Sequence, residues 1–334
     1  MLSVCSVVDP GYSGDVAQTG GACKKGGIIQ KSAITMYRTL VILRHTFLES
    51  VVQPIYSLLL ILGAAILLVF AMLPFFTLGE DTTMYKTVGL DVILLFVLVA
   101  TLFATSRSIY EEIEDRTMLT LMSKPLRRWE VLLGKYLGII CSALLAVVVL
   151  GAIICLATWW RIPQDYQFNT RSLDERIVRS TLEHREMHLA GLIPSLILVW
   201  LQVSVLAAIG VAVSTRVSLV VNLPIVIFIY IAGNLTRFLP QAITPDSSLF
   251  SRAVGGAFST LVPFLEVFDL RKLTVYSTIA LGGTQFASDV NAVSLANIWK
   301  NVGIATLYAI AYTTFALSAG LLLFHNRELG GGEG

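Results

Sequence analysis

The sequence has 334 residues, of which 55% are hydrophobic and only 14% are charged, whereas about 25% of the residues in an average soluble domain are charged. This composition argues against a water-soluble enzyme, and the net charge of +2 gives no reason to expect nucleic acid as a partner. Six stretches together contain a single charged residue, Asp91, and they lie at 55–73, 88–106, 136–160, 189–213, 218–236 and 302–324.

Each stretch has close to the roughly 20 residues that an α-helix needs to cross about 30 Å of hydrocarbon. The stretches are apolar on every side, whereas transmembrane strands alternate polar and apolar residues, and a helix satisfies its own backbone in lipid. The sequence therefore predicts an all-α polytopic membrane protein with six transmembrane helices. We divide the chain into a disordered cytoplasmic tail (1–31), a transmembrane domain (32–329) and a flexible tail (330–334).

The segment before the first stretch has the pattern of an interfacial helix. Between residues 32 and 51, apolar residues recur at helical spacing while Arg38, His45 and Glu49 fall on another face. Pro54 then turns the chain toward the membrane. A simple extension of the first span is the alternative interpretation, and the pattern favours a helix that lies along the inner surface.

The charges beside the stretches indicate how the chain is oriented. Six helices place both termini on one side of the membrane. Lysine and arginine divide almost evenly between the two sides, but the densest basic cluster, Lys124, Arg127, Arg128 and Lys135, directly precedes the third stretch. Because basic residues gather on the cytoplasmic side, we expect both termini in the cytoplasm and the protein in the inner (plasma) membrane.

The loop after the second stretch, at residues 107–138, has an internal order that goes beyond a set of solvated charges. Four acidic residues, Glu111, Glu112, Glu114 and Asp115, come first, and an apolar half-turn pattern follows. Pro125 should end that helix, and a basic helix then leads into the third stretch. We expect a short helical hairpin that projects from the membrane. A solvated loop that obeys the positive-inside rule is the alternative, and composition alone favours it.

This order resembles the cytoplasmic loop of permease subunits of ABC-2 type ATP-binding-cassette transporters. The matching residues are Glu112, Glu114, Asp115, Arg116 and Thr117, then Leu121, Lys124-Pro125, Arg127-Arg128 and Gly134-Lys135. Many members have glycine where Arg116 stands, so the motif here is a variant. The resemblance covers about 32–329 and includes the amphipathic helix, the six spans and the long final outer loop at 238–301, which in the family forms short helices that cap the outer end of the pathway.

The resemblance implies the membrane half of an ATP-driven transporter, with the direction of an exporter. It implies partner ABC ATPase subunits, a second permease copy in a homo- or heterodimer, and surrounding membrane lipids. The sequence has no G-x-x-x-x-G-K-[ST] motif, so we expect neither cofactor nor enzymatic activity on this chain, with ATP and magnesium bound by the partner ATPase. In the family the loop is a coupling helix that docks on the ATPase, and the implied contact residues are Glu111, Glu112, Glu114, Asp115, Arg116, Thr117, Leu121 and Met122.

Three polar residues inside the stretches, Asp91, Gln202 and Asn222, could line a substrate path or form hydrogen bonds between helices. For Gln202 and Asn222 the packing interpretation is favoured. Asp91 lies three residues from the predicted start of its helix on the outer side, where the helix dipole and interfacial water stabilise an anion. Gly134 and Gly138 form a G-x-x-x-G pair that predicts close helix packing rather than a binding site.

Two other functional classes are possible on this sequence. A secondary, ion-coupled transporter is the main alternative, but internal repeats and buried acids near the membrane midplane, which are typical of such carriers, are not evident. A membrane metalloenzyme could use His184 and His188, whose i, i+4 spacing suits zinc. Arg185 stands where the H-E-x-x-H motif has glutamate, so a solvated flank is the simpler interpretation.

Overall fold

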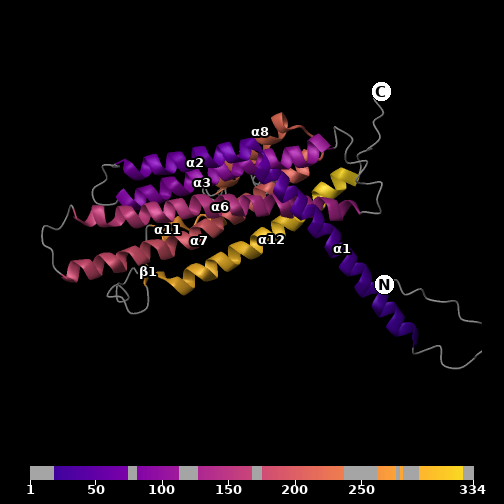
Figure 1. Ribbon diagram of the computed structural model, residues 1–334, viewed down its shortest axis with the longest axis horizontal. Coiled ribbons are helices and arrows are strands. Elements are labelled where there is room, and N and C mark those ends of the chain that lie inside the picture. The colour runs from indigo at the N-terminus through magenta and orange to yellow at the C-terminus, as the bar shows by residue number, and fades with distance from the viewer. Residues whose placement is uncertain are drawn as a thin grey trace, which may run out of the picture.

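The protein is a bundle of long α-helices (Figure 1). A computed structural model describes residues 19–73, 81–112, 127–167, 175–236, 262–275, 279–280 and 293–325. The long helices are α1 (Thr19–Val52), α2 (Pro54–Met72), α3 (Asp81–Ser106), α6 (Arg128–Gln167), α7 (Glu175–Ser214), α8 (Leu219–Leu235) and α12 (Leu295–His325). The short elements are η1 (Arg107–Glu111), η3 (Leu265–Phe268), α11 (Arg271–Thr274) and the parallel pair β1 (Ile279–Ala280) and β2 (Val293–Ser294).

Five helical segments in the described part of the chain are long and apolar enough to cross a membrane. They are Pro54–Met72, Thr82–Glu111, Arg128–Arg161, His188–Ser214 and Leu295–Leu323. The prediction of an all-α polytopic membrane protein is therefore confirmed. The fifth predicted stretch corresponds to α8, whose 17 residues extend roughly 26 Å, at the short limit for a transmembrane helix. The total of six spans stays a prediction.

The helices extend beyond the predicted stretches because charged residues are buried at their ends. The helix α3 begins at Asp81 rather than at 88, and α6 begins at Arg128, in agreement with the predicted basic helix that leads into the third stretch. Within these extensions, Lys86, Glu130 and Lys135 are only 1%, 2% and 3% exposed. A helix that is ended at its first charged residue is therefore predicted too short here, since these charged side chains pack inside the bundle.

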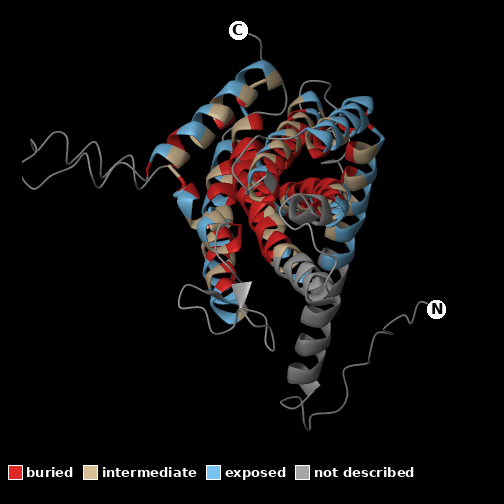
Figure 2. Ribbon diagram, turned by 90° about the vertical axis from the view of Figure 1, so that its left-hand side faces the viewer, coloured by how far each residue is buried: buried red, intermediate tan, exposed pale blue. Residues whose placement is uncertain are grey.

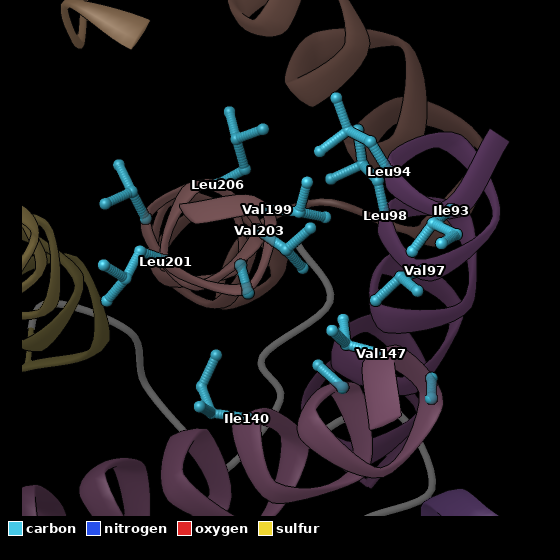
Figure 3. Close-up of a cluster of buried hydrophobic side chains, with 14 of the residues drawn as sticks. Ile93, Leu94, Val97, Leu98, Ile140, Val147, Val199, Leu201, Val203 and Leu206 are labelled. Carbon is cyan, nitrogen blue, oxygen red and sulfur yellow. The ribbon is translucent and has the colours of Figure 1, made fainter. Parts of the chain in front are cut away.

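The centre of the bundle is formed by α3, α6 and α7. Figure 3 shows part of this core, with the labelled side chains Ile93, Leu94, Val97, Leu98, Ile140, Val147, Val199, Leu201, Val203 and Leu206, all of them buried. Buried residues are concentrated where the helices face one another (Figure 2). In the most apolar 18-residue part of α7, 72% of the residues are buried. The corresponding buried fractions are 22% in α2 and 17% in α12. The apolar outer faces of α2 and α12 therefore suit contact with lipid.

The helix α1 lies at an oblique angle to the other helices. The start of α1 and the end of α12 lie toward the same end of the bundle (Figure 1). An even number of membrane crossings predicts this arrangement of the two ends. The expected disordered tail includes residues 19–31, but the structure has helix from Thr19 onward, because extending an existing helix costs far less than nucleating one. Residues 1–18 lie outside the described ranges.

Arg161 of α6 fastens the C-terminal end of α2. Its guanidinium donates hydrogen bonds to the carbonyl oxygens of Phe70, Ala71 and Leu73 at 3.0, 3.3 and 3.0 Å. The guanidinium carbon also lies 5.5 Å from the centroid of the Tyr85 ring. The last carbonyls of a helix have no intrahelical donor, so Arg161 supplies the missing partners and a favourable positive charge.

We expect Arg161→Met to lower the thermal unfolding midpoint of the purified protein. The substitution leaves the buried Ala71 carbonyl and the part-buried carbonyls of Phe70 and Leu73 without this donor, and a buried unsatisfied acceptor costs about 1–3 kcal/mol. Arg107→Met is the matched control, because Arg107 forms an exposed i, i+4 pair with Glu111 at 3.6 Å, and such surface pairs contribute at most about 1 kcal/mol. Equal changes in Tm for the two variants would show that Arg161 does not stabilise the end of α2.

Candidate functional site

Polar side chains gather at two places in the bundle, and the first is where α3 passes into the loop toward α6. The π-helical turn η1 continues α3 directly, and the described chain resumes at Arg127. We call this region, residues 106–112 and 127–135, the loop end. The predicted contact residues Glu114, Asp115, Arg116, Thr117, Leu121 and Met122 fall within 113–126, outside the described ranges.

Lys135 is the central residue of the loop end. Its ammonium lies 2.6 Å from the Glu112 carboxylate and donates hydrogen bonds to the Ser108 hydroxyl at 3.2 Å and to the Ser108 carbonyl. Ser108 belongs to η1, so one side chain from α6 holds both the π-helical turn and the residue that follows it. A π-helical turn within a longer helix is frequently found at a functional site.

The two described members of the predicted contact set point in different directions. The side chain of Glu112 is 26% exposed and turned toward Lys135, whereas that of Glu111 is 55% exposed and pairs only loosely with Arg107, at 3.6 Å. Glu111 is thus available at the surface, while Glu112 is engaged within the chain. The sequence motif includes Lys135, but its position before a long apolar helix suggested only the positive-inside rule.

The loop end is also linked to α1. Glu49 lies within electrostatic range of Lys135, and its carboxylate is 3.8 Å from the Nδ1 atom of His45. Gly134 and Gly138, on the same part of α6, face α1 closely: a Cβ atom built on Gly138 would lie 2.8 Å from the Leu43 carbonyl oxygen. The predicted close packing at the glycine pair is therefore present, and its partner is α1.

The second place is a cavity of about 460 Å³ between α3, α7, α8 and the segment at 262–275. We call it the polar cavity. Its walls combine apolar side chains with several polar ones. The lining residues are Leu90, Asp91, Leu94, Ser195, Leu198, Val199, Gln202, Tyr230, Ile231, Asn234, Leu235, Phe268, Asp269, Leu270 and Arg271. Of the three polar residues singled out in the sequence, Asp91 and Gln202 meet in this cavity.

Asp91 is paired with a cation from a distant part of the sequence. Its Oδ1 atom lies 2.5 Å from Nη2 of Arg271, and the Nε atom of Arg271 lies 3.6 Å from Oδ1 of Asp269. Since α3 begins at Asp81, Asp91 lies well inside its helix, and the expected stabilisation by a nearby helix start is wrong. Burial disfavours the charged guanidinium, but the hydrogen bond and charge of Asp91, together with Asp269, raise the pKa of Arg271 above its ordinary value.

Gln202 and Asn222 have different surroundings. Gln202 is 8% exposed and lines the polar cavity, and its amide is not among the enclosed side-chain atoms that lack a hydrogen bond in the described part, whereas Asn222 Oδ1 is. Asn222 is fully buried away from that cavity, where its Nδ2 atom donates to the Ser106 hydroxyl at 3.0 Å and so links α8 to α3. Of these two residues, only Gln202 lines the cavity, together with Asp91.

The segment at 262–275 closes one side of the polar cavity and is firmly docked. The Phe264 amide donates to the Tyr308 hydroxyl at 2.7 Å, and Ser195 and Thr274 share a hydrogen bond of 2.8 Å. Leu265 is fully buried against α8. Short helices were expected in the loop at 238–301, and η3 and α11 are such elements within its described part.

Of the two histidines whose spacing suits zinc, the structure describes the side chain of His188. The Nδ1 atom of His188 lies 2.9 Å from Nζ of Lys86, so the ammonium donates a hydrogen bond to this imidazole nitrogen. The side chain of His184 lies outside the described part. Across the described ranges there is no cluster of three or more His, Cys, Asp or Glu residues that could hold a metal ion.

The chain matches a family model described as "ABC-2 family transporter protein" over residues 55–329. The match begins within α2 and includes both the loop end and the polar cavity. A search among curated proteins found no match.

Proposed function

Because the chain belongs to the ABC-2 family of transporter proteins, we propose that it is the permease subunit of an ATP-driven exporter, coupled to separate ATPase subunits through the loop after α3. It is a multi-pass membrane protein. In this proposal a second permease copy completes the transporter, the partner subunits bind ATP and magnesium, and both termini face the cytoplasm from the inner membrane. The basic cluster at 124–135 supports this orientation.

The observation that carries the proposal is the anchoring of the loop by Lys135. A nucleotide-dependent change in a partner can bias the membrane bundle only through contacts that differ between two states. Such a contact must be fixed rigidly to the helices that move. The bond network from Lys135 to Glu112 and Ser108 joins the start of the loop to both α3 and α6, which belong to the central core.

The helix α3 connects the loop end to the polar cavity. The apolar segment Thr82–Glu111 is one continuous helical rod, with Ser108 near one end and Leu90, Asp91 and Leu94 lining the cavity farther along. A displacement of the loop by an ATPase would therefore be transmitted along α3 to the cavity wall. Such a path is what an ATP-coupled permease requires.

Reversing two loop charges tests the coupling assignment. We expect the double variant Glu114→Lys and Asp115→Lys to reduce co-purification of the ATPase at least about tenfold, since opposite charges across an interface become like charges. The matched control is the double variant Glu186→Lys and Glu266→Lys. It reverses the charge of two acidic residues that are exposed and lie far from the loop along the chain. Unchanged association of the loop variant would refute the coupling role of this loop.

A further inference from the structure

The polar cavity has an excess of negative charge. Its charged lining residues in the described part are two carboxylates, Asp91 and Asp269, and one guanidinium, Arg271. Arg271 contacts both acids, yet it neutralises only one of the two charges. Beyond their bonds to Arg271, neither carboxylate has a hydrogen bond within the described ranges. One oxygen of each acid is thus left to interact with a cation that enters the cavity.

From this arrangement we propose that the polar cavity binds an amphipathic organic cation, with its positive charge at Asp91 and Asp269 and its apolar body against the leucine-rich wall. This inference rests on the proposed function, because it names the class of substrate that the permease carries. The cavity volume of about 460 Å³ falls in the usual range for small-molecule sites of about 300–1,000 Å³.

The apolar and aromatic lining supports a ligand with a substantial body. Leu94, Leu198 and Val199 form part of the wall, and the rings of Tyr230 and Phe268 also line the cavity. Aromatic faces attract cations through the ring quadrupole, so this lining stabilises both parts of an amphipathic cation. A small inorganic cation would gain nothing from these apolar walls.

Gln202 gives an independent indication that the cavity holds a ligand. Its side chain is more than nine-tenths buried and lines the cavity, and in the described part of the chain its amide forms no hydrogen bond with the protein, although its atoms are not fully enclosed. The amide therefore opens on the cavity, where its donor and acceptor are available to whatever occupies the space. A polar group on the ligand could form a hydrogen bond with this amide while its positive charge interacts with the acids.

The test compares two probes that have the same shape and opposite charge. Full-length protein in lipid nanodiscs, without ATPase or nucleotide, is titrated with radiolabelled tetraphenylphosphonium and, separately, with tetraphenylborate. Empty nanodiscs correct for partition into lipid. We expect saturable binding of the phosphonium and at least about tenfold weaker binding of the borate. Equal or tighter binding of the borate would overturn the proposal on the wild-type protein alone.

Three variants assign the selectivity to the cavity. We expect Asp269→Asn to weaken phosphonium binding about five- to tenfold, and Arg271→Gln to strengthen it by a similar factor, because the cavity charge becomes less and more negative, respectively. Glu266→Gln, an exposed acid on the same segment that is not among the lining residues, should change nothing. If Asp269→Asn has no effect, or if Arg271→Gln weakens binding as well, the charges are structural and the proposal fails. Association with the ATPase is measured separately by co-purification. Failure of the cation-binding test therefore contradicts this inference without contradicting the proposed function.

Discussion

Replacing Lys135 by methionine is expected to uncouple ATP hydrolysis from the permease while the helical bundle stays folded. Methionine fills a similar volume without the ammonium group. Glu112 and Ser108 then lose the donor that lies 2.6 Å from the carboxylate and 3.2 Å from the hydroxyl. The carboxylate of Glu112 is partly exposed and can turn to water, so the loop start is released from α6 rather than the whole bundle being disrupted.

The measurement is the ATPase rate of the partner subunits with and without the reconstituted permease. Losing a buried charged donor costs about 1–3 kcal/mol, and about 1.4 kcal/mol corresponds to a tenfold change in an equilibrium. We therefore expect permease-dependent stimulation of the ATPase to fall at least about tenfold in Lys135→Met. Glu112→Gln should have a smaller effect, because its amide oxygen still accepts a hydrogen bond from the lysine.

Lys86→Met is the matched control for this experiment. Lys86 is also a fully buried lysine, and its ammonium contacts the Nδ1 atom of His188 at 2.9 Å. It lies near the start of α3, whereas Lys135 contacts the turn that follows the end of α3. We expect Lys86→Met to lower Tm by a similar amount and to leave ATPase stimulation near the wild-type value. Equal loss of stimulation in both variants would mean that stability, not coupling, explains the effect of Lys135.

The sequence predicts the helices well because their apolar runs are long, and it fails at their ends for a specific reason. In the sequence, Lys86 and Lys135 have the character of residues in aqueous loops, but both are buried. The partner of Lys86 is His188, 102 positions away, and a partner of Lys135 is Ser108, 27 positions away. A charge count along the chain contains no information about such pairing. The charge pattern therefore predicts a start of α3 that lies too far inside the true helix, and so wrongly puts Asp91 near a helix start.

The candidate site was predictable only in part, and for the same reason. The intramembrane position of Asp91 and Gln202 marks them as unusual in the sequence, but their meeting in one cavity depends on how α3 and α7 pack. The partner of Asp91 is Arg271, 180 positions later in the chain. The spacing of Gly134 and Gly138 predicts a close helix contact, while the identity of the contacting helix, α1, follows only from the three-dimensional arrangement.

Replacing Gly138 by alanine is expected to displace α1 from α6. A Cβ atom at this position would lie 2.8 Å from both the Leu43 carbonyl oxygen and the Thr46 Cβ atom, and 3.1 Å from the Phe47 amide nitrogen. Two of these are backbone atoms, so no rotamer change relieves the clash and α1 must shift. Overpacking of this kind costs about 1–3 kcal/mol, and we expect a lower Tm for the purified chain.

Gly303→Ala provides the control, because Gly303 is also a helical glycine in an apolar helix, α12, and a Cβ atom there meets no other atom within 4 Å. Alanine has the higher helix propensity, by about 1 kcal/mol, so this variant should be neutral or slightly stabilised. Similar Tm values for Gly138→Ala and Gly303→Ala would contradict close packing between α1 and α6. Limited trypsin digestion after Arg44, an exposed residue of α1, should be faster only in Gly138→Ala.

The displacement of α1 should also weaken coupling, since α1 brings Glu49 within electrostatic range of Lys135. Glu49→Gln removes that charge without moving the helix, and we expect it to retain wild-type trypsin resistance while reducing ATPase stimulation modestly, about two- to threefold. Gly138→Ala should reduce stimulation further, because it alters the position of α1 as well as the charge that Lys135 experiences. If Gly138→Ala releases α1 but leaves stimulation unchanged, α1 has only a structural role and the coupling pathway is confined to α3 and α6.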